Sequence, residues 1–229
     1  MSDSALPHNK MKHPVIFCDF DGTITNSDNI VAIMKYFKPE GVEMIIQQLI
    51  SQEISIRQGV SAMFGLIPSS ERDELIQCVL GQAGIREGFA EFLDFLRECN
   101  IPFYVTSGGI DFFMKPLLAA FNIPSEHIYC NEADFTEDHI TINWPHPCDD
   151  QCSSDCGMCK TTVIRRFSED HYERILIGDS ISDFEGAKLA DRVYSRASLT
   201  KKCQELGVTH TPFETFFDIK EDLLSREGA

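Results

Sequence analysis

An apolar run of four residues, Val15 to Cys18, ends abruptly in two carboxylates, Asp19 and Asp21. A run this short and this apolar is typical of a strand that is buried on both faces of a parallel sheet. Two like charges at the end of a buried strand are costly unless a cation neutralises them. The pair therefore indicates a site for a divalent metal, although an Asp-rich turn that caps a helix would look similar.

Beyond residue 84 the sequence alternates between strand and helix patterns. Strands are predicted at residues 102–106, 128–130, 174–177 and 192–195, and helices at 111–121, at 160–168 and from Asp183 onward. A hairpin is expected with its turn at residues 137–139. This alternation predicts an α/β fold, with a Rossmann-like parallel sheet covered by helices on both faces.

Between about Asn29 and Ala83 the chain shows only helical spacing. Because this block follows the first strand and precedes the others, we interpret residues 28–84 as a small helical cap. The core would then consist of residues 11–27 and 85–229. Residues 1–10 are polar and lack the apolar region of a secretion signal, so they are expected to be a disordered lead-in.

Composition narrows the classes of function. With 20 Lys and Arg against 36 Asp and Glu, the formal net charge is −16. Such an excess of acid argues against nucleic acid or a membrane as partner, and no apolar stretch approaches the roughly 20 residues of a membrane span. Nine cysteines are many for an intracellular enzyme, but their odd number fits poorly with a closed disulfide framework. A cytoplasmic location is expected. No oligomeric state is predicted.

Further polar groups follow predicted strands or open a predicted helix. They are Ser107-Gly108-Gly109, Lys160, and the pair Asp179 and Asp183 after Gly178. In α/β sheets ligands bind at the carboxyl ends of the strands. A Ser-Gly-Gly turn before a helix offers a hydroxyl and backbone N–H groups to phosphate. Each group has an ordinary explanation when it stands alone, as a turn or a surface lysine, but together and in this order they favour one site.

These motifs resemble those of the haloacid dehalogenase-type phosphatase superfamily, and the resemblance covers nearly all of the chain after Met11. The matching positions are Asp19 to Thr23, Ser107, Lys160, and Gly178 to Asp183. The resemblance implies the corresponding fold with its cap. It implies that Asp19 is a nucleophile that becomes an aspartyl phosphate, and that Asp21 acts as general acid and then base.

The same resemblance implies a Mg²⁺ site formed by Asp19, the backbone carbonyl of Asp21, and Asp179. Ser107 and the N–H of Gly108 would bind phosphoryl oxygens, and the Lys160 ammonium would offset charge in the transition state. Asp183 would orient Lys160 or a metal-bound water rather than bind the metal directly.

The predicted cap lies where phosphoserine phosphatases carry theirs. Those enzymes have a Glu soon after the Asp motif and a cap Arg that holds the substrate carboxylate. By register these positions are Asp28, a candidate substrate-binding residue, and Gly59, while Arg57 would project from another helix face. The missing cation argues against phosphoserine as substrate. The candidates for an apolar cap surface are Met34, Phe37, Met63 and Phe64, although each of them is more often an ordinary core residue of a helical cap.

Residues 143–160 are expected to form a cysteine-rich loop within the core. Cys148, Cys152, Cys156 and Cys159 could supply four thiolates to a structural Zn²⁺, or be reduced thiols or labile disulfides. With residues 17–26 and 103–109, this loop resembles phosphatases of methionine salvage in bacilli. That branch implies a small phosphorylated substrate, an uncharged thioether-bearing enol. The alternatives are a phosphatase of another small phosphomonoester, such as phosphoserine or a phospho-alcohol amine, and a non-catalytic zinc-binding interaction module.

Overall fold

A computed structural model describes residues 12–227 of the chain. The disordered lead-in expected at residues 1–10 lies outside the described residues. Within them a sheet of seven strands runs in the order β4-β3-β2-β1-β5-β6-β7. All neighbouring strands are parallel except β3 and β4, which pair as an antiparallel hairpin. The predicted α/β class, parallel sheet and hairpin are confirmed.

The strands are β1 His13–Cys18, β2 Phe103–Ile110, β3 Ile128–Asp134, β4 Thr141–Asn143, β5 Tyr172–Gly178, β6 Arg192–Ser195 and β7 Thr211–Pro212. Strands β2, β3 and β5 are longer than predicted by a few residues, β6 has its predicted bounds, and β7 was not predicted. The helices are α1 Asn29–Phe37, α2 Val42–Ile50, α3 Ile56–Phe64, α4 Arg72–Gln82, α5 Phe89–Glu98, α6 Asp111–Leu118, α7 Lys160–Arg165, α8 Phe184–Ala187, α9 Ala197–Leu206 and α10 Phe216–Glu227. Among these helices we find no apolar segment long enough to cross a membrane.

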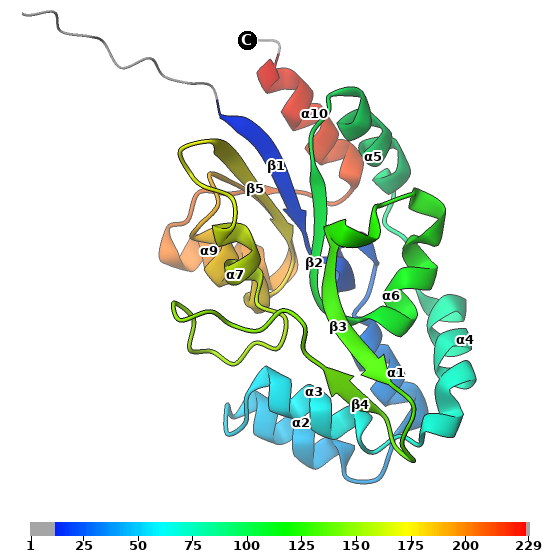
Figure 1. Ribbon diagram of the computed structural model, residues 1–229. Helices are drawn as coiled ribbons and strands as arrows, with labels where there is room; N and C mark the ends of the chain where they lie inside the picture. Colours follow the sequence, from blue (N-terminus) through cyan, green and yellow to red (C-terminus); the bar gives the residue numbers. More distant parts are fainter. Residues whose placement is uncertain (1–11, 228–229) are drawn as a thin grey trace, which may run out of the picture.

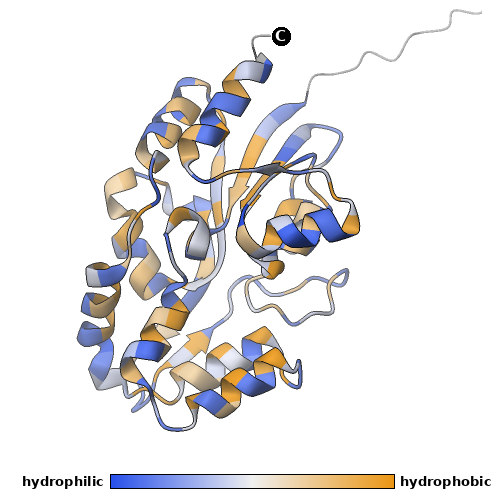
Figure 2. Cartoon of the chain, turned by 180° about the vertical axis from the view of Figure 1, so that it is seen from behind, coloured by the Kyte–Doolittle hydropathy of each residue, from blue (hydrophilic) through white to orange (hydrophobic). Residues whose placement is uncertain are grey.

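Helices cover both faces of the sheet: α5, α6 and α10 lie on one face, and α7 and α9 on the other (Figure 1). The central strand shows why. Along β1, Ile16 and Cys18 enter the larger apolar cluster of the core, whereas Val15 and Phe17 enter a second cluster with residues of α7 and α9. Because successive side chains of a strand point to opposite faces, an apolar strand requires cover on both sides. The central strands accordingly carry continuous hydrophobic stretches, whereas most helices alternate between hydrophobic and hydrophilic residues (Figure 2).

Helices α1 to α4 are inserted between β1 and β2, with α2 and α3 beyond the carboxyl ends of the strands (Figure 1). The insert shares the larger apolar cluster with the sheet. Three of the candidates for an apolar cap surface belong to this cluster: Met34, Met63 and Phe64 are 4%, 6% and 0% exposed. Phe37 is partly buried and packs against the same cluster. The structure therefore assigns these side chains to the core rather than to an apolar surface of the cap.

Gly59 lies in the contact between α2 and α3. A Cβ atom at this position would collide with the side chain of Leu49. Position 59 therefore faces a neighbouring helix and has no room for an arginine. The absence of a cation there follows from helix packing.

The chain beyond residue 195 adds elements that the sequence patterns did not predict: α9, the two-residue strand β7, and α10. Helix α10 packs on α5, with the ring centroid of Phe216 5.0 Å from that of Phe89 and 5.3 Å from that of Phe92. These aromatic contacts close the apolar face of α5. Two residues are too few for a periodic pattern, which is why β7 escapes prediction.

Candidate active site

Asp19 follows β1 directly and is 4% exposed. The chain then turns sharply at Gly22, whose φ is +78°, and a Cβ atom there would collide with the carboxylate of Asp179. Only glycine satisfies both conditions at low cost. Gly22 thus allows the loop after β1 to lie directly against the loop after β5.

Lys160, the first residue of α7, reaches two of the carboxylates. Its Nζ donates a hydrogen bond of 2.6 Å to Oδ1 of Asp19 and another to Oδ1 of Asp183. Burial by itself lowers the pKa of Lys160, but the carboxylates of Asp183 and Asp19 outweigh it and raise the pKa. Burial raises the pKa of Asp19, and the Lys160 ammonium opposes that shift. The lysine therefore stays charged and holds its carboxylate partners in place.

Both oxygens of Asp183 are engaged. Oδ1 accepts from Lys160, while Oδ2 accepts from the backbone N–H of Asp179 at 3.2 Å and of Ser180 at 3.0 Å. Asp183 is fully buried. These bonds fix the loop after β5 and orient the ammonium of Lys160.

Asp21 lies beside Asn29 at the start of α1. Its Oδ1 accepts from the backbone N–H of Asn29 at 3.0 Å and from Nδ2 of Asn29 at 2.6 Å. Burial and the nearby charge of Asp28 raise the pKa of Asp21 to about 7, although the Asn29 bonds oppose this shift. Asp28 itself is exposed and caps α1, because its Oδ1 accepts from the N–H of Val31 at 2.9 Å.

Ser107, Gly108 and Gly109 belong to β2 rather than to a turn. The strand shifts register between Thr106 and Ile110 and continues until α6 begins at Asp111, which corrects the predicted turn. The hydroxyl oxygen of Ser107 accepts from the N–H of Gly109 at 3.0 Å, so its own hydrogen can be donated. A Cβ atom at Gly109 would lie 2.7 Å from Oδ2 of Asp21, whereas beside Gly108 there is open space. The sheet thus brings Ser107 and Asp21 to the same place.

Three carboxylates meet between these loops. One oxygen each of Asp19, Asp179 and Asp183 lies within 4.8 Å of the others. Burial and the charge of Asp183 raise the pKa of Asp179 to about 6. Carboxylate oxygens this close together, with pKa values raised by burial and by neighbouring charge, fit the neighbourhood of a divalent cation such as Mg²⁺.

Two arginines that the sequence patterns did not single out hold the loop after Asp19. Buried Arg86 donates through Nε to the carbonyl of Thr23 at 2.6 Å and through Nη2 to that of Gly22 at 2.8 Å and of Thr25 at 3.0 Å. Arg196 donates from Nη1 to the Gly22 carbonyl at 3.1 Å. Arg196 directly follows the predicted strand 192–195, and this position at a strand end could have indicated a site residue. No feature of the sequence around Arg86 indicated its role.

The four cysteines of the loop form a second cluster. Their sulfur atoms all lie within 4.8 Å of one another, and none is in a disulfide. Cys159 immediately precedes Lys160 in the sequence. The two clusters are therefore joined through the start of α7.

Comparison with known proteins adds to this geometry. A family model described as haloacid dehalogenase-like hydrolase matches residues 16–188. Proteins of Bacillus cereus (strain AH820) and Bacillus thuringiensis (strain Al Hakam) are 53% and 52% identical to the chain over 208 residues. These matches cover 91% of this chain and 94% of the relatives. Both relatives are described as 2-hydroxy-3-keto-5-methylthiopentenyl-1-phosphate phosphatase.

Solved structures of phosphoserine phosphatases share the fold. A substrate-bound complex aligns with a TM-score of 0.67 and 16% identity, covering 93% of this chain and 99% of that one. A phospho-aspartyl intermediate analogue aligns with a TM-score of 0.63 and 18% identity, covering 84% and 91%. At these identities the likeness concerns the fold alone.

Proposed function

The chain belongs to the haloacid dehalogenase-like hydrolase family and is a phosphoric monoester hydrolase, and we propose that it acts on 2-hydroxy-3-keto-5-methylthiopentenyl-1-phosphate in methionine salvage. The observation that carries this proposal is the high identity, over nearly the whole chain, to phosphatases of that name. The carboxylate cluster supports it, because Asp19, Asp179 and Asp183 lie together beyond strands β1 and β5, and Lys160 at the start of α7 reaches Asp19.

In this proposal an oxygen of Asp19 attacks phosphorus and the bond to the leaving oxygen breaks, which leaves an aspartyl phosphate. Asp21 gives its proton to the leaving oxygen. It then takes a proton from the water that attacks the aspartyl phosphate, which releases phosphate and restores Asp19. A carboxyl group whose pKa is raised to about 7 suits both tasks, because it exchanges its proton near neutral pH.

Mg²⁺ would be held by Asp19, the backbone carbonyl of Asp21, and Asp179. When bound, it would neutralise part of the charge of the phosphate and of the crowded carboxylates. Asp183 would not bind the metal, because both of its oxygens are engaged by Lys160 and by backbone N–H groups. Its part is to position Lys160.

The phosphoryl oxygens would be bound by the hydroxyl of Ser107, the N–H of Gly108 and the ammonium of Lys160. The open space beside Gly108 supports this assignment, since a phosphate needs close access to the backbone. Asp28 would contact the substrate with the oxygen that does not cap α1.

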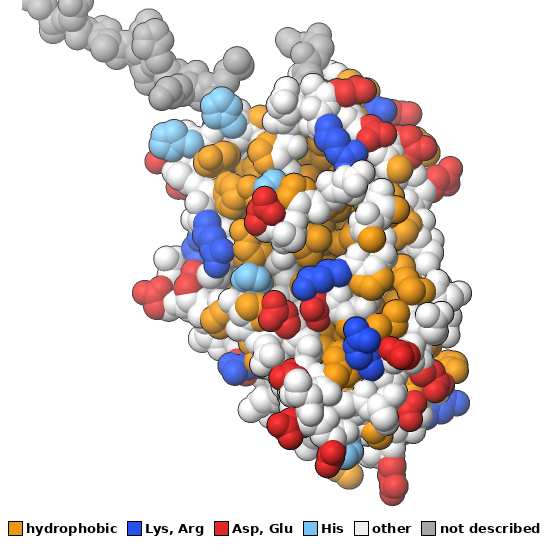
Figure 3. Space-filling view, turned by 45° about the vertical axis from the view of Figure 1, so that its right-hand side comes forward, with side chains coloured by type: hydrophobic (Ala, Val, Ile, Leu, Met, Phe, Trp, Pro, Cys, Tyr) orange, Lys and Arg blue, Asp and Glu red, His pale blue; other side chains and the backbone are white. Residues whose placement is uncertain are grey.

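The proposal includes a cytoplasmic enzyme whose partner is its small substrate rather than nucleic acid or a membrane. The net charge of −16 supports this, since anionic polymers and lipids are repelled. On the face shown in Figure 3, Lys and Arg are scattered among Asp, Glu and apolar side chains and form no continuous basic patch.

The deciding experiment compares Mg²⁺-dependent phosphate release from the enol phosphate and from phosphoserine, with p-nitrophenyl phosphate as a general probe of phosphatase activity. We expect kcat/KM to be at least about 100-fold higher for the enol phosphate. Comparable values for the enol phosphate and phosphoserine, with good hydrolysis of the general probe, would contradict the substrate but keep the phosphatase.

A phosphoserine phosphatase is the alternative that the shared fold raises. It would need a cation to hold the substrate carboxylate. Arg57, the arginine of α3, is engaged with Asp155 at 3.3 Å. Because this arginine already has a carboxylate partner, the contact favours the enol phosphate, which has no carboxylate, over phosphoserine as substrate.

A further inference from the structure

The four cysteines of the cysteine-rich loop have the arrangement of a metal site. Their sulfur atoms lie within 4.8 Å of one another, and those of Cys152 and Cys156 are 3.9 Å apart. Four sulfurs around a tetrahedral Zn²⁺, with Zn–S bonds of about 2.3 Å, are about 3.8 Å apart. We propose that Cys148, Cys152, Cys156 and Cys159 bind one Zn²⁺ as thiolates, each thiol losing its proton to solvent, and that this metal holds Lys160 in place.

The mutual closeness of all four sulfurs distinguishes this proposal from disulfide bonding. Two disulfides require only that the cysteines approach in pairs, whereas one shared metal draws all four to a common centre. The spacing of three, three and two intervening residues gives four ligands from one short segment.

The surroundings of the sulfurs suit a centre with excess negative charge. One Zn²⁺ with four thiolates carries a net charge of −2. The N–H of Cys156 donates to the sulfur of Cys148 at 3.4 Å, and the hydroxyl of Thr161 lies 3.2 Å from that of Cys159. The guanidinium of Arg165 donates to Thr161 at 3.3 Å, although its charge is paired with the carboxylate of Asp149. Backbone N–H and hydroxyl donors of this kind stabilise ligand thiolates.

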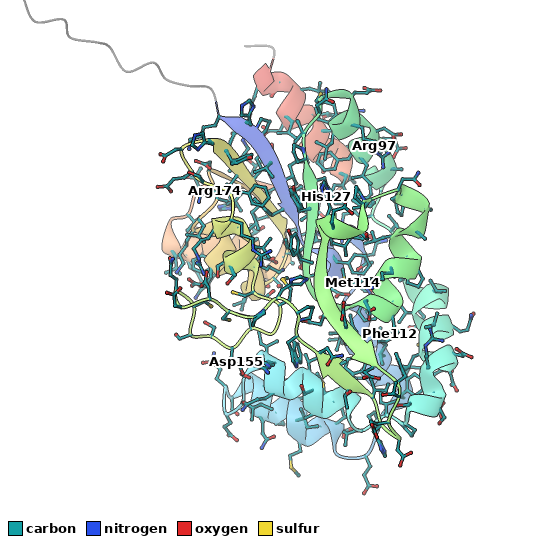
Figure 4. All side chains as sticks on the ribbon, in the orientation of Figure 1. Arg97, Phe112, Met114, His127, Asp155 and Arg174 are labelled. Atoms are coloured by element: carbon teal, nitrogen blue, oxygen red, sulfur yellow. The ribbon has the colours of Figure 1, made fainter. Side chains whose placement is uncertain are left out.

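The loop has no helix or strand of its own to order it, because residues 144–159 contain neither. One end of the loop is Lys160, whose ammonium holds Asp19 and Asp183. Within the loop, Asp155 forms a contact with α3 and its N-cap, and it is labelled in Figure 4 where the loop meets α3. It accepts a hydrogen bond from the hydroxyl of Ser55 at 2.6 Å and pairs with Arg57. A metal that fixes the loop between these two contacts fixes the position of Lys160.

The experiment measures metal and thiols directly. Protein purified without chelator should carry about one zinc per chain by elemental analysis. Chelation should release it and expose four additional thiols to a thiol reagent. The double variant Cys152→Ser/Cys156→Ser should lose the zinc, whereas the control Cys99→Ser, at an exposed cysteine outside the loop, should retain it.

The positioning role has its own readout. After chelation and restoration of Mg²⁺, kcat should fall about 10-fold with a smaller change in KM, because Lys160 acts on the transition state. Added Zn²⁺ should restore kcat. Unchanged kcat in zinc-free protein would overturn this role.

Native protein without zinc, with either four reactive loop thiols or disulfides detected by mass, would overturn the metal site. Should the double variant fail to fold, chelation and thiol counting on the unaltered protein still decide. Elemental analysis and thiol counting do not depend on the substrate. Failure of the zinc site and failure of the proposed function are therefore separate results.

Discussion

The carboxylate site and the cysteine cluster are neighbours built in opposite ways. Lys160, the first residue of α7, meets Asp19, which follows β1, across 141 residues of sequence, because apolar residues of α7 pack against one face of β1. The four cysteines come from twelve consecutive residues in a loop without helix or strand. The first site takes its order from the sheet. The second is ordered by contacts of single residues, such as the ion pair of Asp149 with Arg165, and the proposed Zn²⁺ would add to its rigidity.

Their electrostatics also differ. The carboxylate site contains its own cation, Lys160, and still has raised pKa values at Asp21 and Asp179. The cysteines can act as metal ligands only as thiolates, after their thiol groups have lost their protons. Acid should therefore stabilise the fold around the carboxylate site, where protonation of Asp21 is favoured, and should release the proposed Zn²⁺ from the cysteines.

The largest expected effect is that of Asp19→Asn. The change removes the attacking oxygen charge and keeps the shape, so kcat should fall by at least about 10³-fold. Zinc content should not change, because the cysteines do not touch Asp19. The matched control is Asp73→Asn, at a side chain that is 92% exposed. Activity within about tenfold of the unaltered protein would contradict the covalent mechanism.

A smaller effect is expected for Arg86→Met. The change removes three hydrogen bonds to the carbonyls of the loop after Asp19, and the free energy of unfolding should fall by about 2–4 kcal/mol. The control Arg72→Met alters an exposed ion pair and should cost less than about 1 kcal/mol. Denaturant unfolding measures both, and equal losses would show that Arg86 does not hold the loop.

The smallest effect concerns pH in Mg²⁺-free protein. The pKa of Asp21 is raised to about 7 in the folded chain, so the folded state keeps a proton that the unfolded state loses. Proton binding at Asp21 therefore stabilises the folded state. This stabilisation is fully present below the pKa that Asp21 has in the unfolded chain, and it is lost as pH rises through about 7. Relative to Asp21→Asn, the free energy of unfolding should fall by about 2–3 kcal/mol between about pH 5 and pH 8.

Unfolding of both proteins across this range, with and without Mg²⁺, measures the effect. Zinc content over the same range should change in the other direction and be lost toward acid pH. An unfolding free energy difference that is flat or rises with pH would contradict the raised pKa of Asp21.

The sequence by itself predicted the fold class, every described strand except β7, and the acids, serine and lysine of the candidate site. Strand periodicity and the abrupt change from apolar to polar at a strand end are local signals. In a parallel sheet the carboxyl ends of strands share an edge, so local signals such as those at Asp19 and Asp179 were sufficient to predict one site.

Only the tertiary structure decided the parts that depend on which surfaces meet. Arg86 binds carbonyls that lie about sixty residues earlier in the chain, Gly59 lies against Leu49, and Phe64 is fully buried rather than part of an apolar cap surface. Spacing along one segment specifies a face of a helix or strand, but not the partner of that face. The partner depends on the packing of all the elements together, because burial and hydrogen bonding are satisfied across the whole fold rather than within a segment.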